Sequence, residues 1–216
     1  MIHVECFPLG ELQANCYLAC DKEQGIALLV DPGESSPALV NRIRSRVGDG
    51  LQYILLTHGH FDHIGGVASM KSAFPQARIV IGTADADYPQ LGDKNLAYHF
   101  GGMVEPFIPD CLVNDKDTLP FGTYTIQVLS TPGHTKGGVC YRLDDHLFTG
   151  DTLISGTTGR TDFPTGSIVD MMHSMAKLAQ VEGNPTVYCG HGDITTMDDE
   201  RAYNYFLRKY IYDDLS

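Results

Sequence analysis

Three histidines and an aspartate occupy four of six consecutive positions in this chain, in the pattern His58-x-His60-x-Asp62-His63. Imidazole nitrogens and carboxylate oxygens are ligands that zinc and related divalent ions bind readily in proteins. Four such groups at this spacing are hard to explain as ordinary surface or core residues, so the false-positive risk of the motif is low. The stretch therefore predicts a metal site.

The spacing within the motif predicts two metal ions rather than one. Residues two apart in an extended segment point to the same side, so His58 and His60 can bind one ion together. Asp62 and His63 leave the chain at a different angle and can face a second ion. We therefore expect two adjacent metal ions.

Three further metal-binding side chains, His134, Asp151 and His191, each follow a short apolar run. Taken singly, each would more often be a turn residue than a ligand. Together with the motif, they place metal-binding groups in four loops beyond strand ends, where open α/β sheets carry their functional groups. Asp151 can bridge two ions because each of its oxygens can bind one, and the glycines beside His191 allow close backbone approach. The runs that predict strands before these loops are 53–57, 124–129, 147–150 and 187–189, and a helix is expected from Ile64 to about Phe74.

These motifs resemble those of the metallo-β-lactamase superfamily, and within it the glyoxalase II-like (hydroxyacylglutathione hydrolase-like) hydrolases of the short, single-domain bacterial type. The resemblance spans nearly the whole chain and rests on residues 29–33, 57–63, 131–135, 148–152 and 190–192. It implies an α/β fold, a four-layer αββα sandwich with a two-metal cleft along one edge of its two sheets. It also implies a ligand set, which is His58, His60 and His134 for the first metal, Asp62, His63 and His191 for the second, and Asp151 for both.

The end of the chain departs from full-length glyoxalase II. That family carries a helical domain after its last metal histidine, which supplies much of the glutathione contact, whereas 25 residues follow His191 here. We therefore expect one domain over residues 1–216, without a C-terminal helical thiol-binding domain. The sequence contains no linker, low-complexity tract or internal repeat that would divide it.

Composition and charge indicate a cytoplasmic enzyme that acts on a small molecule. The amino terminus has no signal-peptide pattern, no apolar run approaches the length of a membrane span, and six scattered cysteines predict buried thiols rather than disulfides. The chain has a net charge of −12, and its composition lacks the excess of basic residues from which a nuclease builds a face that holds phosphates. The negative net charge is compatible with a small anionic substrate, because bound cations would make the cleft locally positive. We therefore expect an acyl-thiol substrate, no nucleic-acid or membrane partner, and either a monomer or a homodimer.

Three helices are predicted outside the motifs. Ser36 and Pro37 begin one, and its apolar stripe ends at Gly48. A second has an apolar stripe over 168–179 and is ended by Gly183. Its methionine-rich stripe is interpreted as core rather than as a thioether metal site, and His173 as a surface or packing residue. Thr196, followed by acidic residues, begins a single last helix.

The ligand set predicts the chemistry. Nitrogen and oxygen ligands without thiolate suit zinc and also tolerate iron or manganese. Two cations that share a water would lower its pKa toward neutrality, and the bridging hydroxide would attack the carbonyl of a thioester such as S-lactoylglutathione. Asp62 and Asp151 would position the water, and no serine or cysteine nucleophile is required. We therefore predict a binuclear metallohydrolase, a thioesterase of the glyoxalase II type.

Other chemistries fit much of the same ligand set. The segment 159–163 also resembles the persulfide dioxygenases of the superfamily, in which two histidines and an aspartate, here His58, His134 and Asp151, hold a single iron. A lactonase, another ester hydrolase or a β-lactamase is a further alternative. A non-catalytic metal-binding role is the least favoured, because a decayed site would not be expected to keep seven ligands.

The sequence allows two interpretations for each of two further residues, Arg160 and Asp31. Arg160 could bind a substrate carboxylate through its guanidinium fork, or it could pair with Asp162 and brace the loop. Asp31 could brace the ligand loops by hydrogen bonding, or it could be a turn residue before Pro32 and Gly33. Cys189, two residues before a proposed ligand, is interpreted as a core residue.

Overall fold

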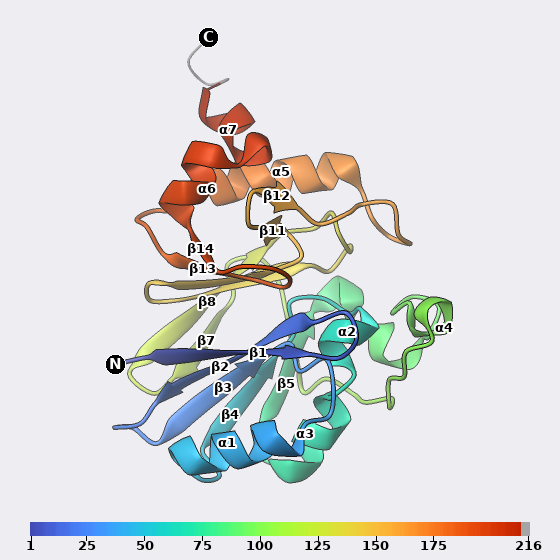
Figure 1. Ribbon diagram of the computed structural model, residues 1–216, viewed down its shortest axis with the longest axis vertical. Helices are drawn as coiled ribbons and strands as arrows, with labels where there is room; N and C mark the ends of the chain where they lie inside the picture. The colour runs from blue at the N-terminus through green and yellow to red at the C-terminus, as the bar shows by residue number, and fades with distance from the viewer. Residues whose placement is uncertain (213–216) are drawn as a thin grey trace.

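Two six-stranded sheets face each other, with helices on both outer surfaces (Figure 1). The computed structural model describes the backbone of residues 1–212 and the side chains of residues 1–209. The first sheet has the spatial order β1 (His3–Leu9), β2 (Ala14–Asp21), β3 (Ile26–Val30), β4 (Leu51–Leu55), β5 (Arg78–Gly82) and β6 (Cys111–Val113). The second has the order β14 (Thr195–Thr196), β13 (Thr186–Cys189), β10 (His146–Gly150), β9 (Val139–Leu143), β8 (Tyr124–Ser130) and β7 (Thr118–Phe121), and a separate hairpin pairs β11 (Leu153–Ile154) with β12 (Thr157–Thr158).

Helices form the two outer layers of the protein. Against the first sheet pack α1 (Pro37–Val47), α2 (Phe61–Ile64) and α3 (Val67–Ala73). Against the second sheet pack α5 (Ile168–Ala179), α6 (Met197–Tyr203) and α7 (Tyr205–Tyr212). The connection from β5 to β6 contains two 3₁₀ turns, η1 (Thr83–Asp85) and η2 (Tyr88–Gln90), and the short helix α4 (Ala97–Phe100). This arrangement is the predicted four-layer αββα sandwich.

The direction of the strands brings several loops to one edge of the molecule. In the first sheet, β3, β4, β5 and β6 are parallel to one another. In the second, β10 and β13 are parallel, and β8 runs the same way because both β8 and β10 are antiparallel to β9. The loops that follow β3, β4, β5, β8, β10 and β13 therefore leave from the carboxyl ends of strands, where this class of sheet holds its functional groups.

The strand that precedes the first histidine motif, β4, is buried on both faces. Tyr53 and Leu55 belong to the core between the two sheets, whereas Ile54 and Leu56 belong to the core between the first sheet and its helices. The apolar run 53–57 predicted this double burial, and the prediction is confirmed. Each such side chain, when fully buried, stabilises the fold by about 1.5–3 kcal/mol. The loop that begins at Thr57 thus starts from a rigid base.

The predicted limits of the helix that begins at Ser36 and Pro37 are confirmed, whereas the helix that Gly183 was predicted to end stops earlier, at Ala179. The Ser36 side chain accepts a hydrogen bond from the Leu39 amide (3.2 Å), and α1 ends at Gly48, which has a left-handed φ of 61°. The stripe of α5 faces the core through Met171, Met175 and neighbouring residues, although Ile168, which the same stripe included, is 54% exposed. His173 is exposed, as a surface residue.

Two segments that were each predicted to form one continuous helix form two helices instead. The helix expected from Ile64 is two helices, α2 and α3, which are separated by Gly65 and Gly66. The single last helix is also two, because the chain turns to an extended conformation at Asn204. The Asn204 side chain is fully buried, and its amide donates to the Thr157 carbonyl (2.9 Å) and to Glu200 (2.7 Å). These bonds hold the break between α6 and α7.

All six cysteines are free thiols, as predicted, but not all of them are buried. Cys16, Cys20, Cys140 and Cys189 are buried, whereas Cys6 is exposed and Cys111 is half-buried. The prediction of burial was wrong for Cys6, since β1 is an edge strand. No helix within residues 1–212 has the length and apolar character needed to cross a bilayer.

Hydrogen bonds from β2 connect the first sheet to the end of β13 in the second. The Asn15 amide group donates to the carbonyls of Cys189 (3.1 Å) and Gly192 (2.9 Å), and the Tyr17 hydroxyl donates to the Cys189 carbonyl (2.6 Å). The Asn15 backbone amide also donates to the Gly190 carbonyl (2.7 Å). Asn15 is 4% exposed, so its donors have little access to water. These bonds fix the loop that carries His191.

Replacing Asn15 with alanine should lower the free energy of unfolding by about 1–3 kcal/mol, because two side-chain hydrogen bonds that join the first sheet to the loop of His191 are lost. Chemical denaturation monitored by circular dichroism measures the change. Asn41, which is exposed on α1, provides the matched control, and Asn41→Ala should stay within about 0.5 kcal/mol of the parent protein. Equal effects of the two substitutions would contradict the role assigned to Asn15.

Candidate metal centre

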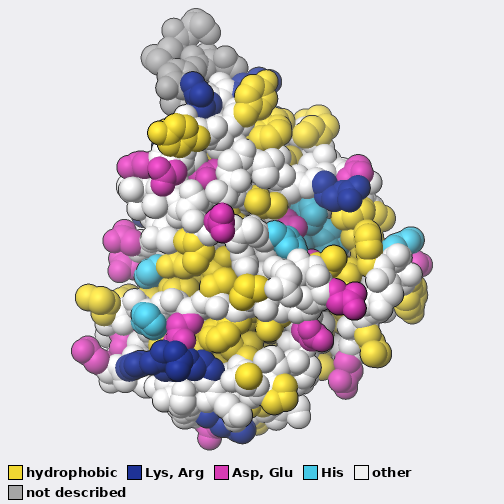
Figure 2. Space-filling model, in the orientation of Figure 1, with side chains coloured by type: hydrophobic (Ala, Val, Ile, Leu, Met, Phe, Trp, Pro, Cys, Tyr) yellow, Lys and Arg dark blue, Asp and Glu magenta, His cyan; other side chains and the backbone are white. Residues whose placement is uncertain are grey.

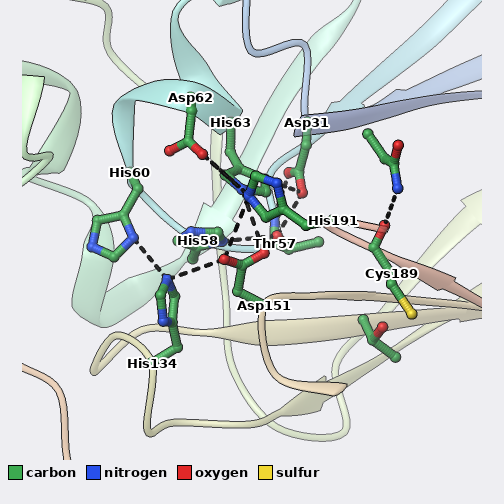
Figure 3. A network of polar contacts seen from close by, with 12 residues as sticks. Asp31, Thr57, His58, His60, Asp62, His63, His134, Asp151, Cys189 and His191 are labelled. Carbon is green, nitrogen blue, oxygen red and sulfur yellow. Dashed lines mark hydrogen bonds and ion pairs between the residues drawn. The ribbon is translucent and has the colours of Figure 1, made fainter. Parts of the chain in front are cut away.

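All seven side chains predicted as metal ligands converge at one edge of the two sheets (Figure 3). His58 and His60 follow β4, and Asp62 and His63 lie on α2. The loops after β8, β10 and β13 supply the other three, His134, Asp151 and His191. On the face seen in Figure 2, histidine side chains reach the surface beside hydrophobic side chains. Segments from both sheets therefore build one site.

A first group of ligands consists of His58, His60 and His134. Their nitrogen atoms lie within 4.8 Å of one another, and all three residues are at least 95% buried. The closest approach joins His60 Nδ1 to His134 Nε2 at 2.9 Å. His134 Nδ1 is 2.7 Å from the Arg160 carbonyl oxygen, to which it donates. That bond fixes the orientation of the ring and directs His134 Nε2 at the other two imidazoles.

A second group consists of Asp62, His63 and His191, and its ligand atoms also lie within 4.8 Å of one another. His191 Nε2 is 3.2 Å and His63 Nε2 is 3.6 Å from the same oxygen of Asp62. The two imidazole Nε2 atoms are 3.4 Å apart. The group is therefore arranged around a common point, as the first one is.

Asp151 lies between the two groups (Figure 3). One of its oxygens is 3.5 Å from His63 Nε2, and the other is 3.5 Å from His134 Nε2 and 3.7 Å from His191 Nε2. A carboxylate in this position can give one oxygen to each of two cations. The geometry thus fits the bridging role that the resemblance implies.

The polar atoms at the centre of the site fit divalent cations. His58 Nε2, His60 Nε2 and Asp151 Oδ1 are buried, and none of them has a hydrogen-bond partner in the described part of the chain. A buried polar atom without a partner destabilises a fold by about 1–3 kcal/mol, and coordination of a cation removes that cost. The donors are imidazole nitrogens and carboxylate oxygens, which suit zinc, iron or manganese.

The protonation preferences of the two groups differ. Burial, together with the neighbouring imidazole of His134, lowers the pKa of His60 to about 2, and burial with four nearby imidazoles lowers the pKa of His58 well below its usual value. Both are therefore neutral, with lone pairs available for a metal. Burial also lowers the pKa of His63, but the carboxylates of Asp62, Asp151 and Asp31 outweigh it and raise the pKa to about 10.

Asp31 connects three parts of the site. It is 1% exposed, and its carboxylate accepts hydrogen bonds from the Thr57 amide (2.8 Å) and the Thr57 hydroxyl (2.6 Å). The same carboxylate lies 3.0 Å from His63 Nδ1, which donates to it and so directs Nε2 to the second group. Of the two interpretations, these contacts correspond to the brace and not to a simple turn residue.

Arg160 lines the cleft but is already paired. Its Nε and Nη2 atoms each lie 2.6 Å from an oxygen of Asp162, and its guanidinium group stacks 4.0 Å above the centre of the Phe163 ring. These contacts correspond to the bracing interpretation, and binding of a substrate carboxylate stays a prediction. The Arg160 carbonyl that orients His134 was not predicted. Every residue has a backbone carbonyl, so the sequence does not show which one will accept a hydrogen bond from a ligand histidine.

The structure places further residues at the site that the sequence patterns did not single out. Phe61, Phe100 and Phe163 form an aromatic wall of the cleft, with the first two rings stacked at 6.1 Å. Asp85, at the end of η1, is fully buried beside the loops that carry His60 and His134. Nothing in the segment 83–87 distinguishes Asp85 from Asp87, which is exposed, because only the packing of η1 decides which one faces inward.

Three comparisons, with family models, with the sequences of known proteins and with solved structures, agree on the family of this chain. A family model described as the Metallo-beta-lactamase superfamily matches residues 9–191. The hydroxyacylglutathione hydrolase GloC of Haemophilus influenzae is 32% identical over 214 residues, which cover 95% of this chain and 98% of the relative. The mitochondrial persulfide dioxygenase ETHE1 of Bos taurus is 30% identical over 195 residues, which cover 87% of this chain and 69% of the relative. The crystal structure of BLEG-1 B3 metallo-beta-lactamase superimposes with a TM-score of 0.88 at 30% identity, covering 95% of this chain and 99% of that one.

Gly190 allows the ligands to pack closely, and replacing it with alanine should weaken metal binding by about 10- to 100-fold. A Cβ atom there would lie 2.2 Å from Asp151 Oδ1 and 2.9 Å from His63 Cε1, so both ligands would have to move. Metal content after dialysis against a graded series of chelator concentrations measures the effect. Gly156→Ala is the control, because its Cβ would meet nothing within 4 Å although its φ of +73° is strained. Retention of metal by Gly190→Ala equal to the control would show that this packing is unimportant.

Proposed function

Because this chain belongs to the metallo-beta-lactamase superfamily, we propose that it is a metal-dependent hydrolase that cleaves a thioester such as S-lactoylglutathione. The observation that carries the proposal is the position of Asp151, between two groups of ligands that each surround a common point. The similarity to a hydroxyacylglutathione hydrolase over 98% of that relative supports the choice of a thioester.

The residues that would hold the metals follow from the two groups. His58, His60 and His134 would bind one ion, Asp62, His63 and His191 a second, and Asp151 both. We propose zinc in both positions, with iron or manganese as alternatives, because the donors are nitrogen and oxygen. Two such ions would supply a water of lowered pKa and would polarise the thioester carbonyl.

The side chains of the cleft would orient the substrate. The metal cleft has a volume of about 420 Å³, and a second cavity of about 500 Å³ shares Leu12, Phe61, Asp62 and Phe100 with it. The aromatic and aliphatic walls would pack against the acyl group and exclude bulk water. The adjoining cavity offers room for the thiol part. Cleavage of the bond between the carbonyl carbon and sulfur would release the thiol and a carboxylic acid.

Polar residues of the cleft have separate tasks in this proposal. The carboxylates of Asp62 and Asp151 would accept hydrogen bonds from the attacking water and hold it against the carbonyl. Arg160, the one arginine or lysine among the residues that line the metal cleft, would face a carboxylate group of the substrate while Asp162 holds it in place.

A persulfide dioxygenase is the second candidate function. The observation that favours it is the similarity to the bovine enzyme at 30% identity. A single iron held by His58, His134 and Asp151 would use part of the same ligand set. A lactone or another ester in place of the thioester would require no change to the ligands.

Replacing His134 with alanine should lower thioester hydrolysis by about 100-fold or more, since even residues that only hydrogen-bond to metal ligands cost 10- to 100-fold when removed. Circular dichroism should show the fold unchanged. His173 on α5 is exposed, and His173→Ala should keep full activity. Turnover by His134→Ala at the parent rate would exclude the mechanism proposed above.

The proposed activity can be tested directly by following thiol release from S-lactoylglutathione with a thiol reagent. The protein is loaded with zinc and assayed under nitrogen, so that oxygen chemistry cannot contribute. We expect release that stops when a chelator is added and returns with metal. Absence of release would contradict the thioesterase, and oxygen uptake by the iron-loaded protein with glutathione persulfide would then identify the dioxygenase.

A further inference from the structure

Asp85 is a buried carboxylate that lies outside the ligand set and contacts two ligand loops. It follows β5 at the end of η1, and its exposed surface is 0%. One oxygen accepts hydrogen bonds from the Gly59 amide (3.1 Å) and the Thr135 hydroxyl (2.7 Å). The other accepts from the Gly137 amide (2.7 Å). All three donors belong to loops that carry histidines.

These donors lie in the two loops that supply the first ligand group, one with His58 and His60 and the other with His134. Gly59 lies between His58 and His60, and Thr135 directly follows His134. The two loops come from different sheets, and 74 residues separate His60 from His134. One carboxylate therefore bonds to both loops at the point where their imidazoles meet. A Cβ atom on Gly137 would lie 2.3 Å from the Asp85 amide nitrogen, so the second loop is also packed directly against η1.

The second ligand group has its own carboxylate. Asp31 accepts from His63 and from Thr57, whose hydroxyl also lies 3.1 Å from His58 Nδ1, whereas none of the hydrogen bonds that Asp85 accepts comes from Asp62, His63 or His191. We propose that Asp85 is a positioning residue that sets the spacing between His60 and His134, and so the metal affinity of the first site, separately from the second.

The chemistry of the three bonds requires a carboxylate. Asp85 offers two acceptor oxygens, and they face two backbone N–H groups and one hydroxyl. An asparagine has one acceptor oxygen, so whichever way its amide turns, one backbone N–H would face an NH₂ group. The Thr135 hydroxyl can reverse its role, but a backbone amide cannot. The isosteric change Asp85→Asn would therefore push one of the two loops away.

The test is a zinc-binding measurement in which a coloured chelator competes for the two sites of the full-length protein. Reference variants assign the sites, because His134→Ala impairs the first and His191→Ala the second. Asp85→Asn should weaken the first site by about 10- to 100-fold and leave the second within about twofold. Asp31→Asn should weaken the second site through His63, and its effect should extend to the first because Thr57 also contacts His58. Asp87→Asn, two residues away on an exposed carboxylate paired with Lys94, should leave both sites unchanged.

A milder pair of variants covers the case in which Asp85→Asn does not fold. Thr135→Val removes one donor to Asp85 and keeps the shape of the fully buried side chain, so it should also weaken the first site selectively. Thr135→Ser restores the hydroxyl and should restore the affinity. An unchanged first site in Thr135→Val, or an equal loss at both sites in Asp85→Asn, would overturn the proposal. The readout is zinc affinity alone, so a failure of thioester hydrolysis would leave this inference standing.

Discussion

A cluster of buried imidazoles and carboxylates that cannot satisfy one another is the constraint on which the rest of the structure depends. Five histidines and two aspartates meet at one edge of the sheets, and three of their atoms have no hydrogen-bond partner among the described residues. Burying such groups works against folding, and imidazoles that lie within about 5 Å of one another would repel if protonated. The surrounding protein must therefore supply enough rigidity to hold the cluster in the form that a pair of cations would stabilise.

That rigidity comes from two sources. Three of the four strands before the ligand loops, β4, β10 and β13, are buried on both faces, so the loops that follow them begin at fixed points. Beyond the strands, hydrogen bonds join segments that are far apart in the sequence. Asp31 ties β3 to the end of β4 and to His63, Asp85 ties the loops of His60 and His134, and Asn15 ties the first sheet to the loop of His191. Three of the four ligand loops, those after β4, β8 and β13, are thus held by contacts with distant segments.

The same arrangement explains why proteins of different activity resemble this chain at about the same level of identity. A hydroxyacylglutathione hydrolase and a persulfide dioxygenase match it at 32% and 30%. The three residues proposed for a single iron are a subset of the seven proposed for two metals. The candidate ligands alone therefore do not distinguish the two activities, and the aromatic wall and the pairing of Arg160 with Asp162 shape the space beside them.

The sequence by itself indicated the seven candidate ligands, the strands that precede them, the limits of α1 and the four-layer fold that the resemblance implies. These features depend on local spacing, such as alternation along a strand or a serine three residues before a helix amide, which is visible in a short window. Only the tertiary structure decided that Asp85 faces the site while Asp87 faces water, that the Arg160 carbonyl orients His134, and that Asn204 breaks the last helix. Each of those outcomes depends on a contact with a distant segment, and the packing of the sheets and loops creates that contact.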